Sequence, residues 1–433
     1  MKFKHFLSLL VIISIGSTAF AISVDRIVIV PRGPDLYVRN ITTALNTKTG
    51  ETLVVWETHP GGPWPQNGEN HEIWGQLLQP DGKPIGSQFR IISSSSNPRR
   101  PHVIYNPDTD QFVLVYSKWK PAVFEEVYAI RLKPTGRRKG KPVLVSHPHN
   151  PAYKIFNGAS VVFYDSENKS ILILFERYEE GPPDPSDSKG IYGAILDSNL
   201  KFRKQPIFVQ STESGPGLFY GPFTTDIKLH EPTGKLLLGQ TLMVPVTFQS
   251  ECLLTQLDPT LSAPVTVLSL DSELQGSWCG VRLMQVPNGK IISLFSRDDG
   301  TKKRKIDSAG APTGSEKKFF AEPLRSTSIG FTGPAFASSD SSKEFAVLGF
   351  IGSEIETAEF WLQRANAKGT SVGSPILIES GVDSRHGGII TALPSVPSKG
   401  HLYAVLYIEG ERDQPPLDNQ GSGLVLLRVN TAP

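Results

Sequence analysis

The chain repeats one hydrophobic pattern about seven times, and this repeat restricts its fold more than any other feature. Each copy begins with a turn and a dense apolar run, and these runs span residues 50–56, 110–116, 170–175, 234–240, 289–295, 343–349 and 401–407. A shorter run follows, as at residues 73–82, and a third run closes the unit, as at residues 88–93. Self-similarity at about 50–60 residues, with about four strand-like runs per period, is typical of β-propellers. We therefore predict an all-β fold, a seven-bladed β-propeller of four-stranded antiparallel blades.

The composition agrees with short strands joined by turns. Among 433 residues there are 35 prolines and 39 glycines, and no long stretch shows the 3.6-residue period of a helix. Length alone would suggest two or three domains, but each unit of a repeat array packs only on its neighbours. We therefore expect a single propeller domain over residues 22–433.

The charge of the chain gives little information about partners. A formal net charge of +2 gives no reason to expect binding to nucleic acid or to an acidic membrane surface. Basic residues cluster at 137–139 and 302–305, where we expect hairpins or an outer strand. A solvated sheet edge is the simplest explanation of both clusters.

The N-terminus has the pattern of a targeting segment. Lys2 and Lys4 precede an apolar stretch at residues 6–15, and small residues end in an A-x-A sequence at Ala21. This order indicates a secretory signal peptide over residues 1–21, with an uncleaved anchor as the alternative. The apolar stretch is too short to span a membrane, and no later window approaches the necessary length. We expect a secreted, extracellular protein without a membrane span.

Two covalent features follow from an extracellular location. The chain has two cysteines, Cys252 and Cys279, and a cysteine pair in a secreted protein usually forms a disulfide. We predict this bridge, although an outer and an inner strand of adjacent blades could lie too far apart for it. Asn40 and Asn168 begin glycosylation sequences, which matter in a source that glycosylates.

The two ends of the repeat array predict how the ring closes. The seventh unit lacks a fourth strand, whereas an apolar strand at residues 26–30 precedes the first unit. Placing this strand as the outer strand of the last blade closes the ring and removes exposed sheet edges. Six blades with an extra hairpin is the alternative, because units four and five match the pattern least well.

The repeat resembles the seven-bladed propeller modules of secreted proteins. The resemblance rests on the turn, on the runs VVW and VLVY, and on the hairpin I-x-G-x-x-L-x-x-x-G. It covers nearly the whole chain after residue 21 and implies architecture only, because the Asp-box, WD, kelch and YWTD motifs are absent from the sequence. Propellers serve as lectins, hydrolases, lyases and docking platforms, so the resemblance leaves the function open.

Long loops and polar strand ends predict a ligand site at the mouth of the central channel. The loops at residues 59–71, 179–190 and 409–423 are longer than hairpins require, and such loops often carry function. Aromatic rings stack on sugars, while Arg, Asn and Glu hydrogen-bond to hydroxyl groups. The candidate ligand-binding residues are Glu57, His59, Trp64, Arg99, His102, Trp119, Asn157, Arg177, Tyr220, Trp278, Arg297, Asp298, Arg385 and His386.

Three functions are compatible with this site. The predicted function is extracellular binding of a glycan or a protein ligand. The first alternative is a glycoside hydrolase or lyase, with carboxylates drawn from Glu57, Glu176, Asp226 and Asp298. The second alternative is a structural matrix protein without a small ligand. The histidines of residues 146–151 fit a turn better than a metal site, and no phosphate or cofactor fingerprint occurs, so we expect no metal and no cofactor.

Overall fold

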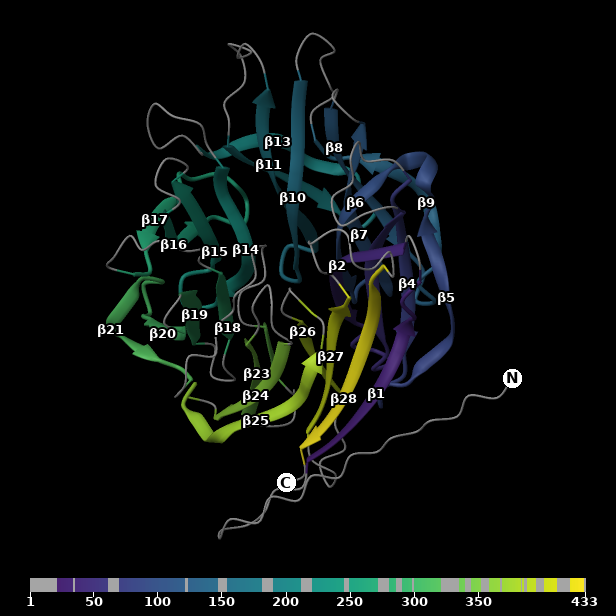
Figure 1. The fold of residues 1–433 in the computed structure, drawn as a ribbon. Coiled ribbons are helices and arrows are strands. Elements are labelled where there is room, and N and C mark those ends of the chain that lie inside the picture. Colours follow the sequence, from purple (N-terminus) through teal and green to yellow (C-terminus); the bar gives the residue numbers. More distant parts are fainter. Residues whose placement is uncertain are drawn as a thin grey trace.

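The computed structural model is a ring of antiparallel sheets around a central axis (Figure 1). It describes residues 22–33, 36–60, 70–120, 124–146, 154–180, 190–211, 220–244, 249–271, 280–285, 290–297, 300–320, 335–338, 344–351, 358–366, 368–382, 384, 388–394, 401–410 and 421–431. The predicted signal peptide at residues 1–21 therefore lies outside the described residues. No helix within these ranges is long and apolar enough to cross a membrane.

Seven blades of four antiparallel strands make up the ring, which confirms the predicted fold and blade number. Blade 1 contains β2 (Leu36–Leu45), β3 (Thr52–Pro60), β4 (Glu72–Leu78) and β5 (Pro84–Ile92); blade 2 contains β6 (Pro98–Asn106), β7 (Gln111–Lys120), β8 (Phe124–Leu132) and β9 (Arg138–Leu144). Blade 3 contains β10 (Lys154–Asp165), β11 (Ser170–Glu180), β12 (Gly190–Asp197) and β13 (Phe202–Ser211); blade 4 contains β14 (Tyr220–His230), β15 (Lys235–Val244), β16 (Gln249–Leu257) and β17 (Thr266–Ser269).

The remaining blades follow the same order. Blade 5 contains β18 (Val281–Gln285), β19 (Ile291–Arg297), β20 (Gly300–Ile306) and β21 (Pro312–Lys318). Blade 6 contains β22 (Ala335–Ser338), β23 (Glu344–Ile351), β24 (Ala358–Asn366) and β25 (Ser371–Val382). Blade 7 contains β26 (Ile389–Leu393), β27 (His401–Glu409), β28 (Gly423–Thr431) and the N-terminal strand β1 (Ile22–Val30). A single-turn 3-10 helix, Ser94–Ser96, links blades 1 and 2.

The dense apolar runs form the second strand of each blade because that strand is covered on both faces. Every residue of β3 except the last is buried. Leu53 and Val55 pack toward blade 2, whereas Val54 and Trp56 pack toward blade 7. Alternate side chains thus enter the interfaces with both neighbours, so the run is continuously hydrophobic rather than alternating. First strands of neighbouring blades contact one another and line the channel.

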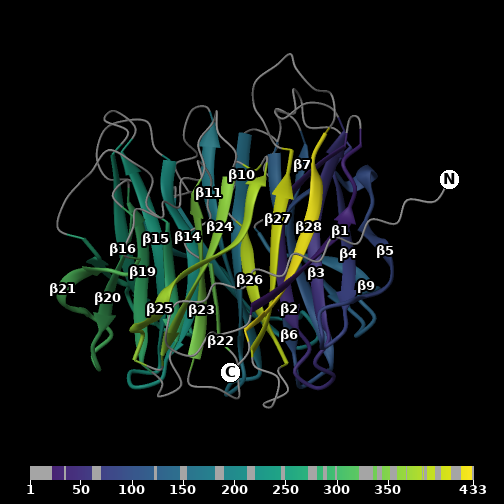
Figure 2. The ribbon, with the colours of Figure 1, turned by 60° about the horizontal axis from the view of Figure 1, so that its bottom comes forward.

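The N-terminal strand closes the ring, as predicted. β1 pairs antiparallel with β28 as the outermost strand of blade 7 (Figure 2). Arg428 of β28 connects three parts of the chain, because its Nη1 donates to Asp25 Oδ2 at 2.8 Å and its Nε donates to the Asp81 carbonyl at 2.7 Å. Asp25 lies in β1 and Asp81 in the last turn of blade 1, so this arginine ties the closing strand to both end blades.

The covalent predictions are only partly covered by the described residues. Cys252 is fully buried in β16, whereas Cys279 lies outside the described residues, so the bridge stays a prediction. Asn40 lies in β2 and Asn168 in the turn after β10, and their glycosylation also stays a prediction.

Candidate functional site

The innermost strands of the first three blades carry a β-bulge at the same position. Residues 40–41 of β2, 100–101 of β6 and 159–160 of β10 fall out of register with the second strand. Asn40 and Arg100 have left-handed backbone conformations there, with φ of 49° and 51°. A bulge leaves backbone groups unpaired within its own sheet, so side chains nearby have to satisfy them. These bulges lie at the end of the channel where the second strands end, which is the predicted mouth.

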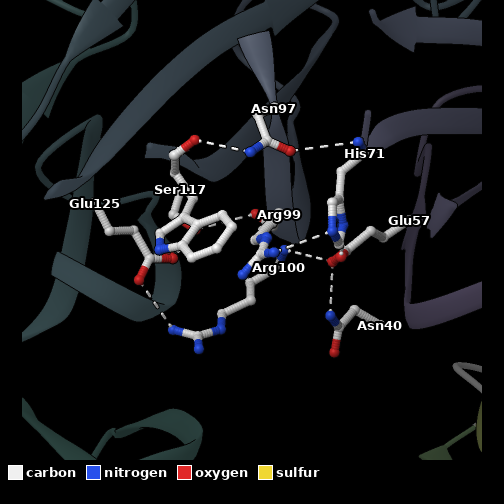
Figure 3. Close-up of polar contacts among 9 residues, drawn as sticks. Asn40, Glu57, His71, Asn97, Arg99, Arg100, Ser117 and Glu125 are labelled. Atoms are coloured by element: carbon white, nitrogen blue, oxygen red, sulfur yellow. Dashed lines mark hydrogen bonds and ion pairs between the residues drawn. The ribbon is translucent and has the colours of Figure 1, made fainter. Parts of the chain in front are cut away.

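Glu57 is the centre of a buried polar cluster at the boundary between blades 1 and 2 (Figure 3). Its side chain is 2% exposed, and one oxygen lies 2.6 Å from His71 Nδ1. The other oxygen accepts from the Asn40 amide at 2.7 Å and from the Arg100 backbone N–H at 2.8 Å. Burial alone would raise the pKa of Glu57, but these hydrogen bonds and the neighbouring imidazole lower its pKa to about 2. Glu57 therefore stays ionised and satisfies a bulge N–H of the next blade.

The contacts of His71 fix its tautomer. Its Nε2 lies 3.1 Å from Nη2 of Arg99. A guanidinium group has only donors, so Nε2 must accept this hydrogen bond and the ring proton must sit on Nδ1. Nδ1 then donates to Glu57, which needs a donor. The result is a chain of charge-assisted hydrogen bonds from Glu57 through a neutral imidazole to Arg99.

Arg99 is held by an aromatic ring as well as by His71. Its guanidinium carbon lies 3.6 Å from the centroid of the Trp119 ring, a cation–π contact. Asn97 orients both neighbours, because its Oδ1 accepts from the His71 backbone at 3.3 Å and its Nδ2 donates to the Trp119 carbonyl at 2.9 Å. Burial lowers the pKa of Arg99 from its usual value, and an arginine remains a cation at neutral pH all the same.

His59 lies behind this chain in an apolar stack. It is 1% exposed and its ring stacks between Tyr37 and His71, with centroid distances of 5.4 and 5.0 Å. Neither ring nitrogen has a hydrogen-bond partner in the part of the chain that the structure describes. Burial, together with the charge of Arg39, lowers the pKa of His59 to about 4. His59 is therefore a neutral, stacked ring at neutral pH.

Blade 2 has its own pair of polar residues one blade further along the ring. The Ser117 hydroxyl donates to Glu125, which is 2% exposed. The other oxygen of Glu125 accepts from Arg100 Nη1 at 3.5 Å. The Arg100 guanidinium lies directly against the Cα of Gly158 in blade 3, where a Cβ would approach Nη1 to 2.1 Å. Arg100 thus contacts blades 1, 2 and 3 from a single bulge.

The predicted site residues fall into three groups. The structure brings Glu57, His59, Arg99 and Trp119 together at the boundary of blades 1 and 2. His102 lies just beyond the β6 bulge, and Arg177 is 3% exposed on β11 with its guanidinium 5.6 Å from the Tyr192 ring. Asn157, Tyr220 and Arg297 lie on β10, β14 and β19. Trp64, Trp278, Asp298, Arg385 and His386 lie outside the described residues.

The sequence prediction missed four members of the cluster: Asn40, His71, Ser117 and Glu125. Asn40 was read only as a glycosylation sequence, whereas Arg100 was expected at the mouth, at the start of an inner strand. The dipeptide before Pro101 was the usable signal, because a residue before proline is restricted and a proline inside a strand usually marks an edge or a bulge. Among the candidate carboxylates, Asp226 accepts the Leu283 backbone N–H of blade 5 at 2.9 Å, so it also links neighbouring blades.

Cationic side chains face the mouth, and the carboxylates lie beneath them. No group of three or more His, Cys, Asp or Glu side chains within the described ranges has metal-binding geometry. Arg99 and Arg100 present guanidinium groups at the mouth, and the side chain of Arg100 is 41% exposed. The carboxylates Glu57 and Glu125 are buried beneath them, 3% exposed each as side chains.

Comparisons with known proteins concern the fold of this chain and do not identify its function. No family model matches the chain, and no curated protein matches it significantly in sequence. A solved protein of unknown function from Dyadobacter fermentans has a TM-score of 0.53 at 9% identity, covering 94% of this chain and 99% of its own. The haemagglutinin-neuraminidase ectodomain of parainfluenza virus 5 has a TM-score of 0.47 at 11% identity, covering 94% of this chain and 83% of its own. Trypanosoma rangeli sialidase has a TM-score of 0.49 at 10% identity, and the match covers 79% of this chain and 56% of the sialidase chain.

All three identities are far below 25%, and the likeness to the Dyadobacter protein, with its TM-score of 0.53, shows the fold alone. The class that the fold defines is the seven-bladed β-propeller closed by its N-terminal strand. Its candidate site is the polar cluster of blades 1 and 2 at the channel mouth.

Proposed function

We propose that this protein is an extracellular glycan-binding propeller whose ligand docks at the channel mouth over blades 1 and 2. The observation that carries the proposal is the fixed guanidinium group of Arg99. It is stacked on Trp119 and hydrogen-bonded to His71, so little side-chain entropy remains to be lost when it binds a ligand.

The neighbouring groups suit a polar, hydroxyl-rich ligand. Asn40 and Arg100 lie on the two adjacent bulges, and both have exposed surface at the mouth. Arginine forks and amides donate to hydroxyl and carboxylate oxygens with defined geometry. Glu57 and Glu125 keep the backbone and side chain of Arg100 in place from below. The mouth therefore offers donors on a rigid frame, which is what recognition of a sugar requires.

Binding is favoured over glycoside hydrolysis by the state of the carboxylates. A glycosidase needs a carboxylic acid of raised pKa and a second carboxylate with a free oxygen. Glu57 has its pKa lowered to about 2, and both of its oxygens accept hydrogen bonds from the protein. Both oxygens of Glu125 also have protein partners, Ser117 and Arg100. Both oxygens of each carboxylate are thus used in holding the frame.

The extracellular part of the proposal is supported by the N-terminal sequence. The basic start, short apolar stretch and A-x-A sequence of residues 1–21 match a secretory signal. Western blotting of the culture medium from expressing cells, with N-terminal sequencing of the released protein, tests it. A mature N-terminus at residue 22 is the expected result, and retention of an uncleaved chain in the membrane fraction would contradict it.

A glycan-array screen of the mature protein tests the binding function. The wild type is compared with Arg99→Ala, with Trp119→Ala, and with Arg90→Ala, which removes an exposed arginine of β5 as a charge control. We expect binding to a defined glycan that falls at least about tenfold in the first two variants and is unchanged in the control. Hydrolysis or cleavage of the bound glycan would show that the protein is an enzyme and not only a binding protein. Binding to no glycan on the array would reject the glycan proposal.

A further inference from the structure

The outer hairpin of blade 2 carries a concentration of positive charge away from the channel mouth. Residues 131–144, which we call the basic hairpin, contain six Lys or Arg and no carboxylate, in a chain whose net charge is only +2. Five of these cations are exposed: Lys133, Arg137, Arg138, Lys139 and Lys141. None of the five side chains forms an ion pair or hydrogen bond with the described residues. The basic hairpin is therefore an uncompensated patch.

The hairpin presents these charges on a rigid turn. The Lys133 N–H donates to the Arg137 carbonyl at 2.7 Å, and the Gly136 N–H donates to the Lys133 carbonyl at 2.8 Å. Gly136 has a φ of 75°, and a Cβ there would approach the Phe89 ring of blade 1 to 2.3 Å. The turn is thus packed against the neighbouring blade and needs glycine at this point. Its charges are held in place before any ligand arrives.

The turn itself does not need the lysine. Four other blades place an acid or an amide at the position equivalent to Lys133, and these residues are Asp197, Asp258, Asp307 and Asn366. Each uses its Oδ1 to accept a backbone N–H two residues later, which stabilises the turn locally. Blade 2 forms the same backbone turn without this acceptor and carries a cation instead. The substitution adds charge and removes a stabilising contact.

Protection of the sheet edge does not require the cations either. Lysine on an outermost strand discourages pairing with other chains. The outermost strands of blades 4 and 6, β17 and β25, contain no lysine or arginine at all. Edges in this propeller are therefore tolerated without basic residues, and the charge of blade 2 calls for another explanation.

We propose that the basic hairpin binds an anionic polysaccharide through its sulfate or carboxylate groups. Arg138 and Lys139 pair with Leu132 and Arg131 of β8, and Lys141 follows in the bulge at Gly140, with all three side chains exposed. With the cations of the turn they form a strip that matches repeated negative charges on an extended polymer. Residues 131–144 include no aromatic side chain, so the stacking platform used to bind nucleic-acid bases is missing. The strip fits a polymer recognised through its charged groups.

This second site is separate from the mouth. Glu125 lies near the start of β8 and Arg131 near its end, about 20 Å away along the strand. Figure 2 shows β9 on the outside of the ring. The inference does not rest on the proposed function, and the variant Arg99→Ala is expected to leave polyanion binding unchanged.

Affinity for defined polyanions tests the inference. The folded protein is titrated with heparin, dextran sulfate, polygalacturonate and single-stranded DNA over a series of salt concentrations. The triple variant Arg138→Ser, Lys139→Ser and Lys141→Ser is compared with a matched triple variant of blade 5, Lys305→Ser, Lys317→Ser and Lys318→Ser, which removes the same charge from three exposed lysines. Dextran sulfate and polygalacturonate separate sulfate from carboxylate recognition.

We expect the wild type to bind at least one polysaccharide and the blade 2 variant to bind it about 30-fold more weakly at 0.1 M salt. The slope of log affinity against log salt should fall by about two in that variant, because three charged contacts are lost. The blade 5 variant should change affinity by less than about threefold. Equal losses in both variants, or unchanged binding in the blade 2 variant, would overturn the proposal. Tighter binding to DNA than to every polysaccharide would overturn the choice of ligand.

Discussion

Blades 1 and 2 each use a buried glutamate to hold Arg100 at the channel mouth, but the two glutamates lie on different strands of their blades. Glu57 of β3 and Ser117 of β7 are equivalent, because each pairs with the residue just before the bulge of its blade and faces the equivalent residue of the third strand. His71 and Glu125 are equivalent in the same way. Blade 1 therefore places its acid on the second strand, and blade 2 places it on the third.

This difference decides what each carboxylate can reach. Glu57 reaches forward to the bulge of the next blade and accepts the Arg100 N–H, whereas Glu125 reaches the Arg100 side chain. The two acids thus hold one residue at two different atoms. A repeat can therefore keep its hydrogen-bond geometry while the residue type at each position changes, and here that change creates a link between blades.

Removal of the blade 1 carboxylate should have the largest effect. Glu57→Gln keeps the shape but replaces one acceptor oxygen by a donor in a fully buried site. We expect a loss of about 3 kcal/mol in the free energy of unfolding, because buried N–H groups are left without acceptors. Glu125→Gln should cost about 1–2 kcal/mol, since its arginine partner is partly exposed and more distant. Chemical denaturation of both variants measures the difference, and equal losses would contradict the comparison.

The two blades should also differ in their sensitivity to acid. His59 of blade 1 has its pKa lowered to about 4, whereas the equivalent residue of blade 2, Trp119, does not titrate. In the unfolded chain a histidine is protonated as the pH falls below about 6.5, whereas in the folded protein His59 is protonated only near pH 4. Stability is therefore present above pH 6.5 and falls by about 2–4 kcal/mol as the pH decreases toward 4.

The variant His59→Phe should remove this dependence. Phenylalanine can stack between Tyr37 and His71 and leaves no buried nitrogen without a partner. Unfolding curves between pH 4 and 7 should be flatter in the variant than in the wild type, with Trp119→Phe as the control. Stability supplied by Glu57, whose pKa is about 2, is lost only below about pH 4.5, so it falls in a separate range. If the pH profile of His59→Phe is the same as that of the wild type, a group other than His59 causes the acid sensitivity.

The blade 2 pair can be tested at its hydroxyl. Ser117→Ala removes the donor of a buried carboxylate oxygen, and we expect a loss of about 1–2 kcal/mol. Ser95→Ala changes an exposed serine between the two blades and should stay within about 0.5 kcal/mol. Thermal unfolding of the two variants compares them directly. If both behave alike, the hydrogen bond of Ser117 does not contribute to stability.

The smallest expected effect concerns the bulge that both acids hold. Arg100 has a φ of 51°, which glycine adopts without strain and alanine does not. Arg100→Gly and Arg100→Ala both remove the partly exposed ion pair, so their difference isolates the backbone conformation. We expect Arg100→Gly to be the more stable by about 1 kcal/mol. Equal stabilities would show that the bulge relaxes when the side chain is removed.

The fold could be predicted because its signal is carried by every repeat. The runs at residues 50–56 and 110–116 became β3 and β7, and the orphan strand at residues 26–30 became part of β1. Glu57, His59, Arg99 and Trp119 lie together because each lies near the end of a second strand or near the start of a first strand. Their role in binding a ligand stays a prediction.

The rest of the cluster could not be predicted because it depends on bulges. A bulge shifts the register by one residue and re-aims the side chains beyond it, and hydrophobic spacing carries no record of that shift. The contact between Glu57 and Arg100 joins residues 43 positions apart in different blades. Ser117 and Glu125 gave no sequence signal because a serine and a glutamate at a strand end are unremarkable.

The position of β1 determines when the molecule can finish folding. Asp25 and Arg428 are 403 residues apart, so the contact that closes blade 7 has nearly the largest loop the chain can form. Such contacts form late, because a long loop has to be closed before they contribute. Of the strands in the ring, β1 is synthesised first and β28 last, so β1 cannot pair with β28 until the rest of the ring has been synthesised. Blades 1 to 6 can assemble while the chain is still being extended, and the ring becomes a closed object only when its two ends meet.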